Sequence, residues 1–235
     1  MRINRKEQFF ITFAAFVALG ASFKVMVLIE GLTEVRPVNA IPPVSGLICG
    51  FVGAFACGLG NLAADMFGSF SAGSALGVVA NFLAALLPYR LWHLFSNEPP
   101  NLHCKKNISL FIAICAVNAL TTAWVLSFGF YLFFDSWIEE IYTYVFFNNL
   151  GFSIGLGMPL LILLTSDSAS IECTKPIPNI ILGKIKAKIP ICAAYALIMI
   201  IIFISVSVLH LRPQEAVWLN ILSALSLAGL LIQTV

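Results

Sequence analysis

The sequence predicts an all-α protein: a polytopic transmembrane helix bundle with six or seven apolar segments, one of which can be re-entrant. Apolar residues make up 60% of the 235 residues, and charged residues only 10%. In a soluble globular chain, charged residues are about a quarter of the total. The mean hydropathy is +0.98, and several apolar windows of about 20 residues can each cross a hydrocarbon core about 30 Å thick. We therefore expect a single integral membrane domain over residues 1–235, multi-pass in the plasma membrane.

The first apolar run covers residues 9–29 and follows three basic residues. It is longer than the roughly 7–15-residue core of a signal peptide, so we interpret it as an uncleaved first helix. Lys24, near its far end, can extend its ammonium group to the membrane interface. Ala14 and Ala18 lie four residues apart and give the helix a small-residue face that suits a partner helix. The same face can equally pack within this chain.

Six further apolar segments follow, and they leave the topology open. Their approximate ranges are 44–64, 72–92, 108–134, 142–165, 189–209 and 216–233. Seven full spans from an inside N-terminus would place the basic connections between these segments outside, against the positive-inside tendency. A re-entrant 44–64 segment, or an outside N-terminus, places the two large basic connections inside. Charge alone does not choose between these arrangements.

The stretch from residue 34 to residue 92 is the predicted functional centre. Prolines at positions 37, 42 and 43 are expected to keep its first part out of a regular helix. Small residues then recur at every fourth position and would form one smooth ridge on a helix; they are Gly46, Gly50, Ala54 and Gly58. In hydrocarbon, such a glycine-rich segment is stable only where protein or a cavity covers it.

Arg36 and Asn39 are the first candidate binding residues. A guanidinium is a planar, permanently charged donor that can hold a carboxylate or phosphate at two points. Asn39 adds an amide donor and acceptor. The alternative for Arg36 is an interfacial anchor, which requires only a cation that reaches the membrane surface.

Amide side chains inside the apolar segments are the second group of candidates. A buried amide is costly without a partner, so each one either bridges helices or faces a cavity; they are Asn61, Asn81, Asn118, Asn148 and Asn149. Asp65 is expected at the turn that ends its helix, because a charge at the bilayer centre is costly. Glycines and a proline after Asn149 predict an interrupted helix. Phe67, Tyr89 or Trp92 could stack on a ligand ring.

Signatures of enzymes are missing from the sequence. The three histidines are scattered, and the chain has no HExxH, no nucleophile elbow, no phosphate loop and no paired acid motif. We therefore expect a protein that is not an enzyme, with no catalytic residues, no metal site and no cofactor. The basic residues are expected to set the topology rather than to bind nucleic acid.

The central stretch resembles the substrate-binding S-components of bacterial energy-coupling-factor (ECF) transporters, nearest the queuosine-precursor branch. The similarity covers residues 10–92, and the rest matches only in hydropathy. The residues that carry it are Arg36-Pro37, Ala40-Ile41-Pro42-Pro43, Gly60-Asn61-Leu62-Ala63-Ala64-Asp65, Gly77, Asn81-Phe82-Leu83-Ala84 and Pro88-Tyr89-Arg90-Leu91-Trp92. The resemblance implies a compact six-helix subunit that uses a separate transmembrane scaffold and two ATPases to take up vitamins and related micronutrients. Ala14 and Ala18 look like the scaffold-docking motif of that group.

The leading hypothesis is a substrate-capture subunit for a small polar or heteroaromatic micronutrient. Its predicted substrate-binding residues are Arg36, Asn39, Asn61, Asn81, Tyr89 and Trp92, and Ala14 and Ala18 are its predicted docking residues. The expected partners are the small-molecule substrate, the ECF scaffold and ATPase subunits, and the lipid bilayer. The rival hypothesis is a membrane assembly or sensory protein in which the same small residues only pack helices.

Overall fold

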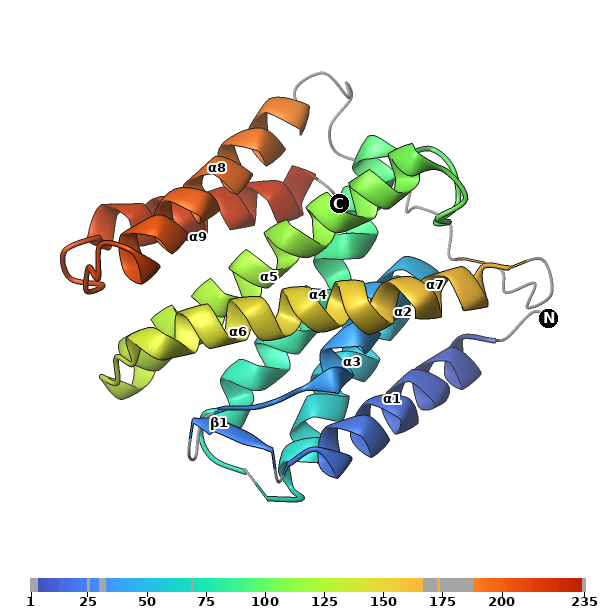
Figure 1. Cartoon of the computed structure of the whole chain (residues 1–235), viewed down its shortest axis with the longest axis horizontal. Coiled ribbons are helices and arrows are strands. Elements are labelled where there is room, and N and C mark those ends of the chain that lie inside the picture. Colours follow the sequence, from blue (N-terminus) through green and yellow to red (C-terminus); the bar gives the residue numbers. More distant parts are fainter. Residues whose placement is uncertain are drawn as a thin grey trace.

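The computed structural model describes residues 4–24, 26–29, 33–68, 70–166, 173 and 188–233. Its elements are α1 (Arg5–Ser22), β1 (Val27–Ile29), β2 (Thr33–Glu34), a 3-10 turn η1 (Pro37–Ala40), α2 (Ile41–Cys49), α3 (Phe51–Asp65), α4 (Ser74–Phe95), α5 (Lys105–Phe134), α6 (Glu139–Phe152), a π-helical turn η2 (Ser153–Gly157), α7 (Met158–Leu164), α8 (Lys188–Ser207) and α9 (Val217–Gln233). They form a helical bundle (Figure 1). The predicted helical class is confirmed, apart from a short antiparallel ribbon of β1 and β2.

Four helical segments are long and apolar enough to cross a membrane, judged by length and composition. These are Ser74–Phe95, Lys105–Phe134, Glu139–Leu164 and Pro190–Ser207. Three further apolar helical segments are shorter: Pro37–Cys49, Phe51–Asp65 and Val217–Ile232. The chain therefore has the helices of a membrane protein, and the predicted number of six or seven spans stays a prediction.

The predicted ridge along a single helix is wrong, because the chain turns back at Gly50. Gly50 has φ 59°, a left-handed conformation that glycine adopts without a steric penalty. Beyond it, α3 packs against α2, so that the Ser45 hydroxyl lies 3.1 Å from the Cys57 sulfur. A side chain at Gly53 would overlap the Ser45 carbonyl. The nine residues of α2 span only about 14 Å, so α2 and α3 form a helical hairpin with a short first arm.

The small residues let backbones approach closely from several directions rather than along one ridge. A Cβ atom on Gly46 would overlap the carbonyl oxygen of Ala85 on α4. On α3, Gly60 contacts Phe16 of α1. A Cβ atom on Gly60 would lie 3.0 Å from the Cβ atom of Phe16. The hairpin is thereby held between α4 and α1.

The prolines before the hairpin do not exclude helix, contrary to the prediction. Pro37 opens the 3-10 turn η1, and Pro42 and Pro43 lie in the first turn of α2. The first backbone N–H groups of a helix have no partner within it, so proline loses nothing there.

The predicted interruption after Asn149 takes the form of a wide turn, not a break. The π-helical turn η2 joins α6 to α7, and the Ser153 hydroxyl donates to the Asn39 carbonyl at 3.3 Å. Gly157 lies against Ala40. A Cβ atom on Gly157 would be 3.2 Å from the Ala40 carbonyl oxygen. The α6–α7 rod therefore packs directly on η1, the segment that carries Asn39.

The two ends of the bundle differ in charge. The start of α1, the α4–α5 connection, the end of α7 and the start of α8 lie at one end, here called the basic end (Figure 1); among its described residues, Arg5, Lys6, Lys105 and Lys106 outnumber the carboxylates Glu7 and Glu98. The ribbon and the α3–α4, α5–α6 and α8–α9 turns lie at the other, here called the acidic end; among its described residues, Asp65, Asp135, Glu139, Glu140 and Glu215 outnumber the basic residues Lys24, Arg36 and Arg212.

Candidate functional site

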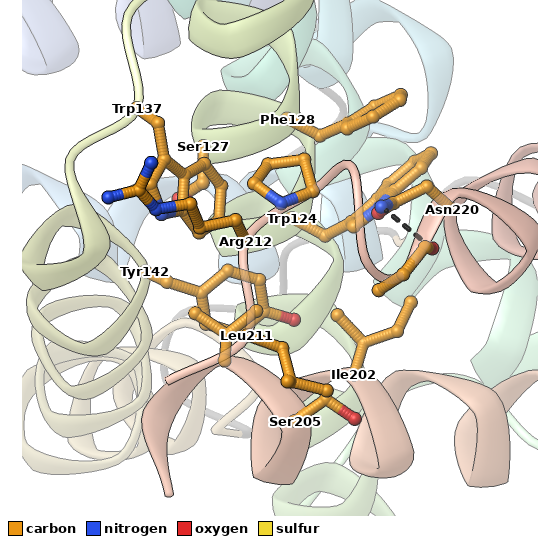
Figure 2. A pocket seen from close by; sticks show the side chains of 13 residues that line it. Trp124, Ser127, Phe128, Trp137, Tyr142, Ile202, Ser205, Leu211, Arg212 and Asn220 are labelled. Carbon is orange, nitrogen blue, oxygen red and sulfur yellow. Dashed lines mark hydrogen bonds between the residues drawn. The ribbon is translucent and has the colours of Figure 1, made fainter. Parts of the chain in front are cut away.

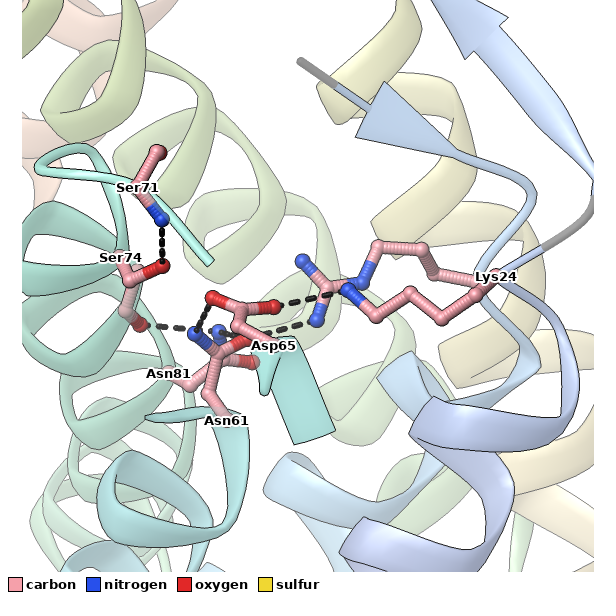
Figure 3. A network of polar contacts seen from close by, with 8 residues as sticks. Lys24, Asn61, Asp65, Ser71, Ser74 and Asn81 are labelled. Atoms are coloured by element: carbon pink, nitrogen blue, oxygen red, sulfur yellow. Dashed lines mark hydrogen bonds and ion pairs between the residues drawn. The ribbon is translucent and has the colours of Figure 1, made fainter. Parts of the chain in front are cut away.

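Polar side chains from several segments converge near the acidic end of the bundle (Figure 3). This polar cluster consists of Lys24, Arg36, Asn39, Asn61, Asp65, Asn81, Asn148 and Asn149. It lies where the C-terminal halves of α1 and α3 meet the start of α4 and the middle of α6. Four of the six predicted substrate-binding residues belong to it: Arg36, Asn39, Asn61 and Asn81.

Asn61 is the hub of the polar cluster. Its carbonyl oxygen accepts hydrogen bonds from Arg36 Nη2 at 2.6 Å and from Asn81 Nδ2 at 3.0 Å. Its own Nδ2 donates to Asp65 Oδ2 at 3.0 Å, one helical turn along α3. Both ends of this fully buried amide are therefore paired, as burial of a polar group requires.

Gly77 makes room for the hub. A Cβ atom at this position would overlap the Asn61 amide nitrogen, so only glycine lets Asn61 lie flat against α4. Asn81, one turn further along α4, also donates to the Gly77 carbonyl at 2.9 Å. The glycine thus brings α3 and α4 close enough for two asparagines to bond to each other.

A buried ion pair ties α1 to this cluster. Lys24 Nζ lies 2.8 Å from Asp65 Oδ1, and the two side chains are only 9% and 10% exposed. Asp65 is the last residue of α3, the position predicted for it. The interpretation of Lys24 as a residue that extends to the membrane surface is wrong, because the ammonium turns inward to Asp65.

Arg36 also links the hairpin to α6. Its backbone N–H donates to Asn148 Oδ1 at 3.2 Å, while its side chain reaches Asn61. Asn149 donates to the Val145 carbonyl in its own helix at 2.9 Å. One half-buried arginine therefore contacts amides that are far apart in the sequence.

A small polar cavity lies within this group. Its volume is about 20 Å³, and it is lined by Arg36, Asn39, Asn81, Thr122, Leu126, Val145, Asn148 and Asn149. That volume holds a water molecule, whereas sites for small organic ligands occupy about 300–1,000 Å³. A larger ligand must therefore take over hydrogen bonds that Arg36 and the asparagines now make with one another.

Tyr89 and Trp92 are not at the cluster, and their predicted stacking role there is not supported. Along α4, Tyr89 lies eight residues beyond Asn81, about 12 Å away. Its ring is buried with Phe16 and Val38. Trp92 is fully buried in the main core, and its indole N–H donates to the Glu98 carbonyl at 3.0 Å. Phe67, the third candidate ring, is 65% exposed beyond the end of α3.

The predicted docking residues lie on the surface of α1. Thr12, Phe16 and Gly20 form the buried face of this helix, whereas Ala14 and Ala18 are exposed. Both alanines are therefore accessible to another protein or to lipid, and their docking role stays a prediction.

Sequence reasoning left four cluster residues out of the predicted site: Lys24, Asp65, Asn148 and Asn149. Asn148 and Asn149 carried a signal, because each is an amide in an apolar segment. Asn118 carries the same signal and lies elsewhere: its amide donates to the Ala84 carbonyl at 3.0 Å and bridges α5 to α4. The Lys24–Asp65 pair has no local signal, since 41 residues separate the two partners.

Within the part of the chain that the structure describes, no three His, Cys, Asp or Glu side chains lie together as metal ligands would. The cluster instead offers cationic and amide donors, amide oxygens and one carboxylate. This set can hold a small polar molecule through several directional hydrogen bonds. Comparison of the chain with protein-family models, curated proteins and solved structures finds no match.

Proposed function

We propose that the protein is the substrate-binding S subunit of an ECF-type uptake transporter, and that the polar cluster binds a small micronutrient or vitamin-like molecule. The observation that carries the proposal is the convergence of Arg36, Asn39, Asn61 and Asn81 on one buried site. The resemblance of residues 10–92 to S-components supports it from the sequence. Scaffold and ATPase subunits of an ECF module would complete the transporter.

The charges at the two ends of the bundle support an orientation suited to uptake. Basic residues next to apolar helices favour the cytoplasmic side. The basic end then faces the cytoplasm, and the acidic end, with the polar cluster, faces outward (Figure 1). In the plasma membrane, this places the proposed binding site on the side from which a nutrient arrives.

The same orientation suggests six crossings and one re-entrant hairpin. The α2–α3 hairpin would enter from the outer side and return to it, because the ribbon that precedes it and the α3–α4 turn that follows it both lie at the acidic end. The crossing elements are then α1, α4, α5, the α6–α7 rod, α8 and α9. Six is the number that the resemblance implies, and the apolar run at residues 216–233 becomes the sixth crossing.

Cysteine labelling from outside intact cells tests this topology. With the native cysteines replaced, we expect single cysteines at His103 and Lys188 to resist a membrane-impermeant reagent and a cysteine at Ser136 to react, because positive charge marks the cytoplasmic side. Reaction of the first two and protection of the third would place the polar cluster inside and contradict uptake from outside.

The small volume of the polar cavity is an observation that favours the rival hypothesis. In the described residues, cluster side chains hydrogen-bond to one another or to nearby backbone groups, and the cavity among them is only about 20 Å³. A membrane assembly or sensory protein could use such a network solely to fix its helices. The two functions differ in one respect: a binding site exchanges these internal bonds for bonds to a ligand, and a packing network keeps them.

Docking to a scaffold makes a separate prediction at Ala14 and Ala18. Replacing both with leucine should abolish uptake and leave ligand binding to the isolated subunit unchanged, since both positions are exposed and lie off the buried face of α1. Uptake assays in cells and binding assays on the purified subunit measure the two effects. Parallel loss of uptake and binding would instead indicate a packing role within the bundle.

A further inference from the structure

An apolar groove lies between α1 and α7, with α2 as its floor. Ile11, Ala15 and Leu19 line it from α1, and Leu160 and Leu164 line it from α7. The α2 residues of the floor are buried, whereas Ile11 is 58% exposed and Leu19 38% exposed at the rim. The groove therefore opens sideways, on the outer surface of the bundle.

The groove is large enough for an organic ligand. Its volume is about 380 Å³, within the range of about 300–1,000 Å³ that small-molecule sites occupy. By contrast, the cavity between α5, α8 and the α8–α9 turn (Figure 2) has only about 10 Å³, the space of one water molecule. Most of the side chains that line the groove are aliphatic, so its ligand must be largely hydrocarbon.

The shape of the groove suits a single extended hydrocarbon chain. Between Gln8 and Leu19, the first and last α1 residues that line it, α1 rises about 16 Å. This length matches half of a hydrocarbon core about 30 Å thick. Spread over that length, the volume corresponds to a channel about 5 Å across, whereas a helix with its side chains is about 10–12 Å wide. Carbon atoms in contact are about 4.0–4.5 Å apart, so one acyl chain fits and a partner helix does not.

Positive charge lies at the end of the groove where a lipid headgroup would be. The start of α1 and the end of α7 are both at the basic end (Figure 1). Arg5 is exposed and precedes Gln8 by three residues, so it shares the groove face of α1 one turn earlier. Glu7 is on a different face, and its carboxylate accepts a hydrogen bond from the Asn4 backbone N–H at 2.9 Å. A guanidinium at the position of Arg5 suits a phosphate, which it can bind with two parallel hydrogen bonds.

We propose that the groove binds one acyl chain of an anionic phospholipid from the membrane leaflet at the basic end, with the lipid phosphate next to Arg5. In the orientation proposed above this is the cytoplasmic leaflet, whose anionic lipids attract basic segments. The bound chain would cover the exposed rim and join α1 to α7 across α2. The inference rests on the membrane position of α1 and is independent of whether the polar cluster binds a substrate.

Native mass spectrometry of the full chain in detergent micelles tests the proposal, with phosphatidylglycerol and phosphatidylcholine of identical acyl chains as probes. We expect one phosphatidylglycerol to bind each wild-type chain about fivefold more tightly than phosphatidylcholine, the contribution of one basic residue near the surface. Arg5→Gln should remove this difference. Ala15→Phe fills the groove and should weaken binding of both lipids by roughly tenfold or more, because the displaced chain loses the burial of several methylene groups.

The matched controls are Ala194→Phe, which places the same ring at an exposed position of α8, and Lys6→Gln. Lys6 is at the same end of α1 as Arg5, but it is two residues from Gln8 and therefore off the groove face. Both controls should bind the two lipids as the wild type does. Because Ala15 is exposed, the phenylalanine variant is expected to fold, and its midpoint of thermal unfolding checks this.

Equal lipid binding by Ala15→Phe and Ala194→Phe would overturn the proposal and indicate unspecific lipid around the bundle. An equal loss of the phosphatidylglycerol preference in Arg5→Gln and Lys6→Gln would contradict a specific phosphate contact. A co-purifying protein that is lost only from Ala15→Phe, with lipid binding unchanged, would assign the groove to a protein partner instead.

Discussion

Replacing Arg36 with lysine should weaken ligand binding by roughly ten- to over a hundredfold. The guanidinium reaches the Asn61 carbonyl at 2.6 Å at the edge of the polar cavity. A hydrogen bond to a charged group contributes about 1.5–3 kcal/mol, which gives this range of affinity. Lysine keeps the charge but lacks the planar fork that makes two parallel contacts. Affinity is measured for the small molecule that co-purifies with the wild type.

Membrane abundance and ligand affinity of Arg36→Lys and Arg36→Ala distinguish a ligand-binding role of Arg36 from a role as an interfacial anchor. An interfacial anchor needs only a cation, so lysine would then bind the ligand as well as arginine does, and only alanine would lower abundance. Unchanged affinity in the lysine variant would rule out the gripping role.

Replacing Gly46 with alanine should have the largest effect on folding. The added Cβ atom overlaps the carbonyl oxygen of Ala85, a backbone atom that cannot move without shifting α4. Overpacking of this kind typically costs about 1–3 kcal/mol, and rigid backbone on both sides places this site at about 3 kcal/mol or more. We expect a lower yield of folded protein and a clear drop in the midpoint of thermal unfolding in detergent.

Gly151→Ala is the matched control, because a Cβ atom on Gly151 meets nothing within 4 Å. Alanine also favours the helical conformation over glycine by about 1 kcal/mol. The control should therefore unfold at the same temperature as the wild type or higher. An equal loss in both variants would mean that the α2–α4 contact is not as close as the structure shows.

Half of the polar cluster could be predicted from the sequence, because buried amides restrict their own surroundings. Asn61 and Asn81 lie in apolar segments, so each needs a polar partner, and the structure pairs them with each other. Arg36 and Asn39 precede the hairpin closely enough to join them. The same reasoning cannot distinguish Asn118 from the cluster amides, because it too is a buried amide, although its partner is a backbone carbonyl on another helix.

Predictions that depended on the path of the backbone failed. Small residues at every fourth position are compatible with a continuous helix, but a glycine among them also permits the left-handed conformation that turns the chain at Gly50. Tyr89 and Trp92 share α4 with Asn81, but the rise of the helix carries them about 12 and 16 Å away. The Lys24–Asp65 pair depends on how α1 lies against α3, which no local pattern encodes.

Native mass spectrometry of the purified protein tests most directly whether the polar cluster binds a substrate. The wild type is compared with Asn81→Ala, which removes a cluster amide, and with Asn118→Ala, which removes a buried amide outside the cluster. We predict one co-purified small molecule per wild-type chain, its retention in Asn118→Ala and its loss in Asn81→Ala. A wild type without any bound molecule, or equal retention in both variants, would contradict binding at this cluster and favour a packing network.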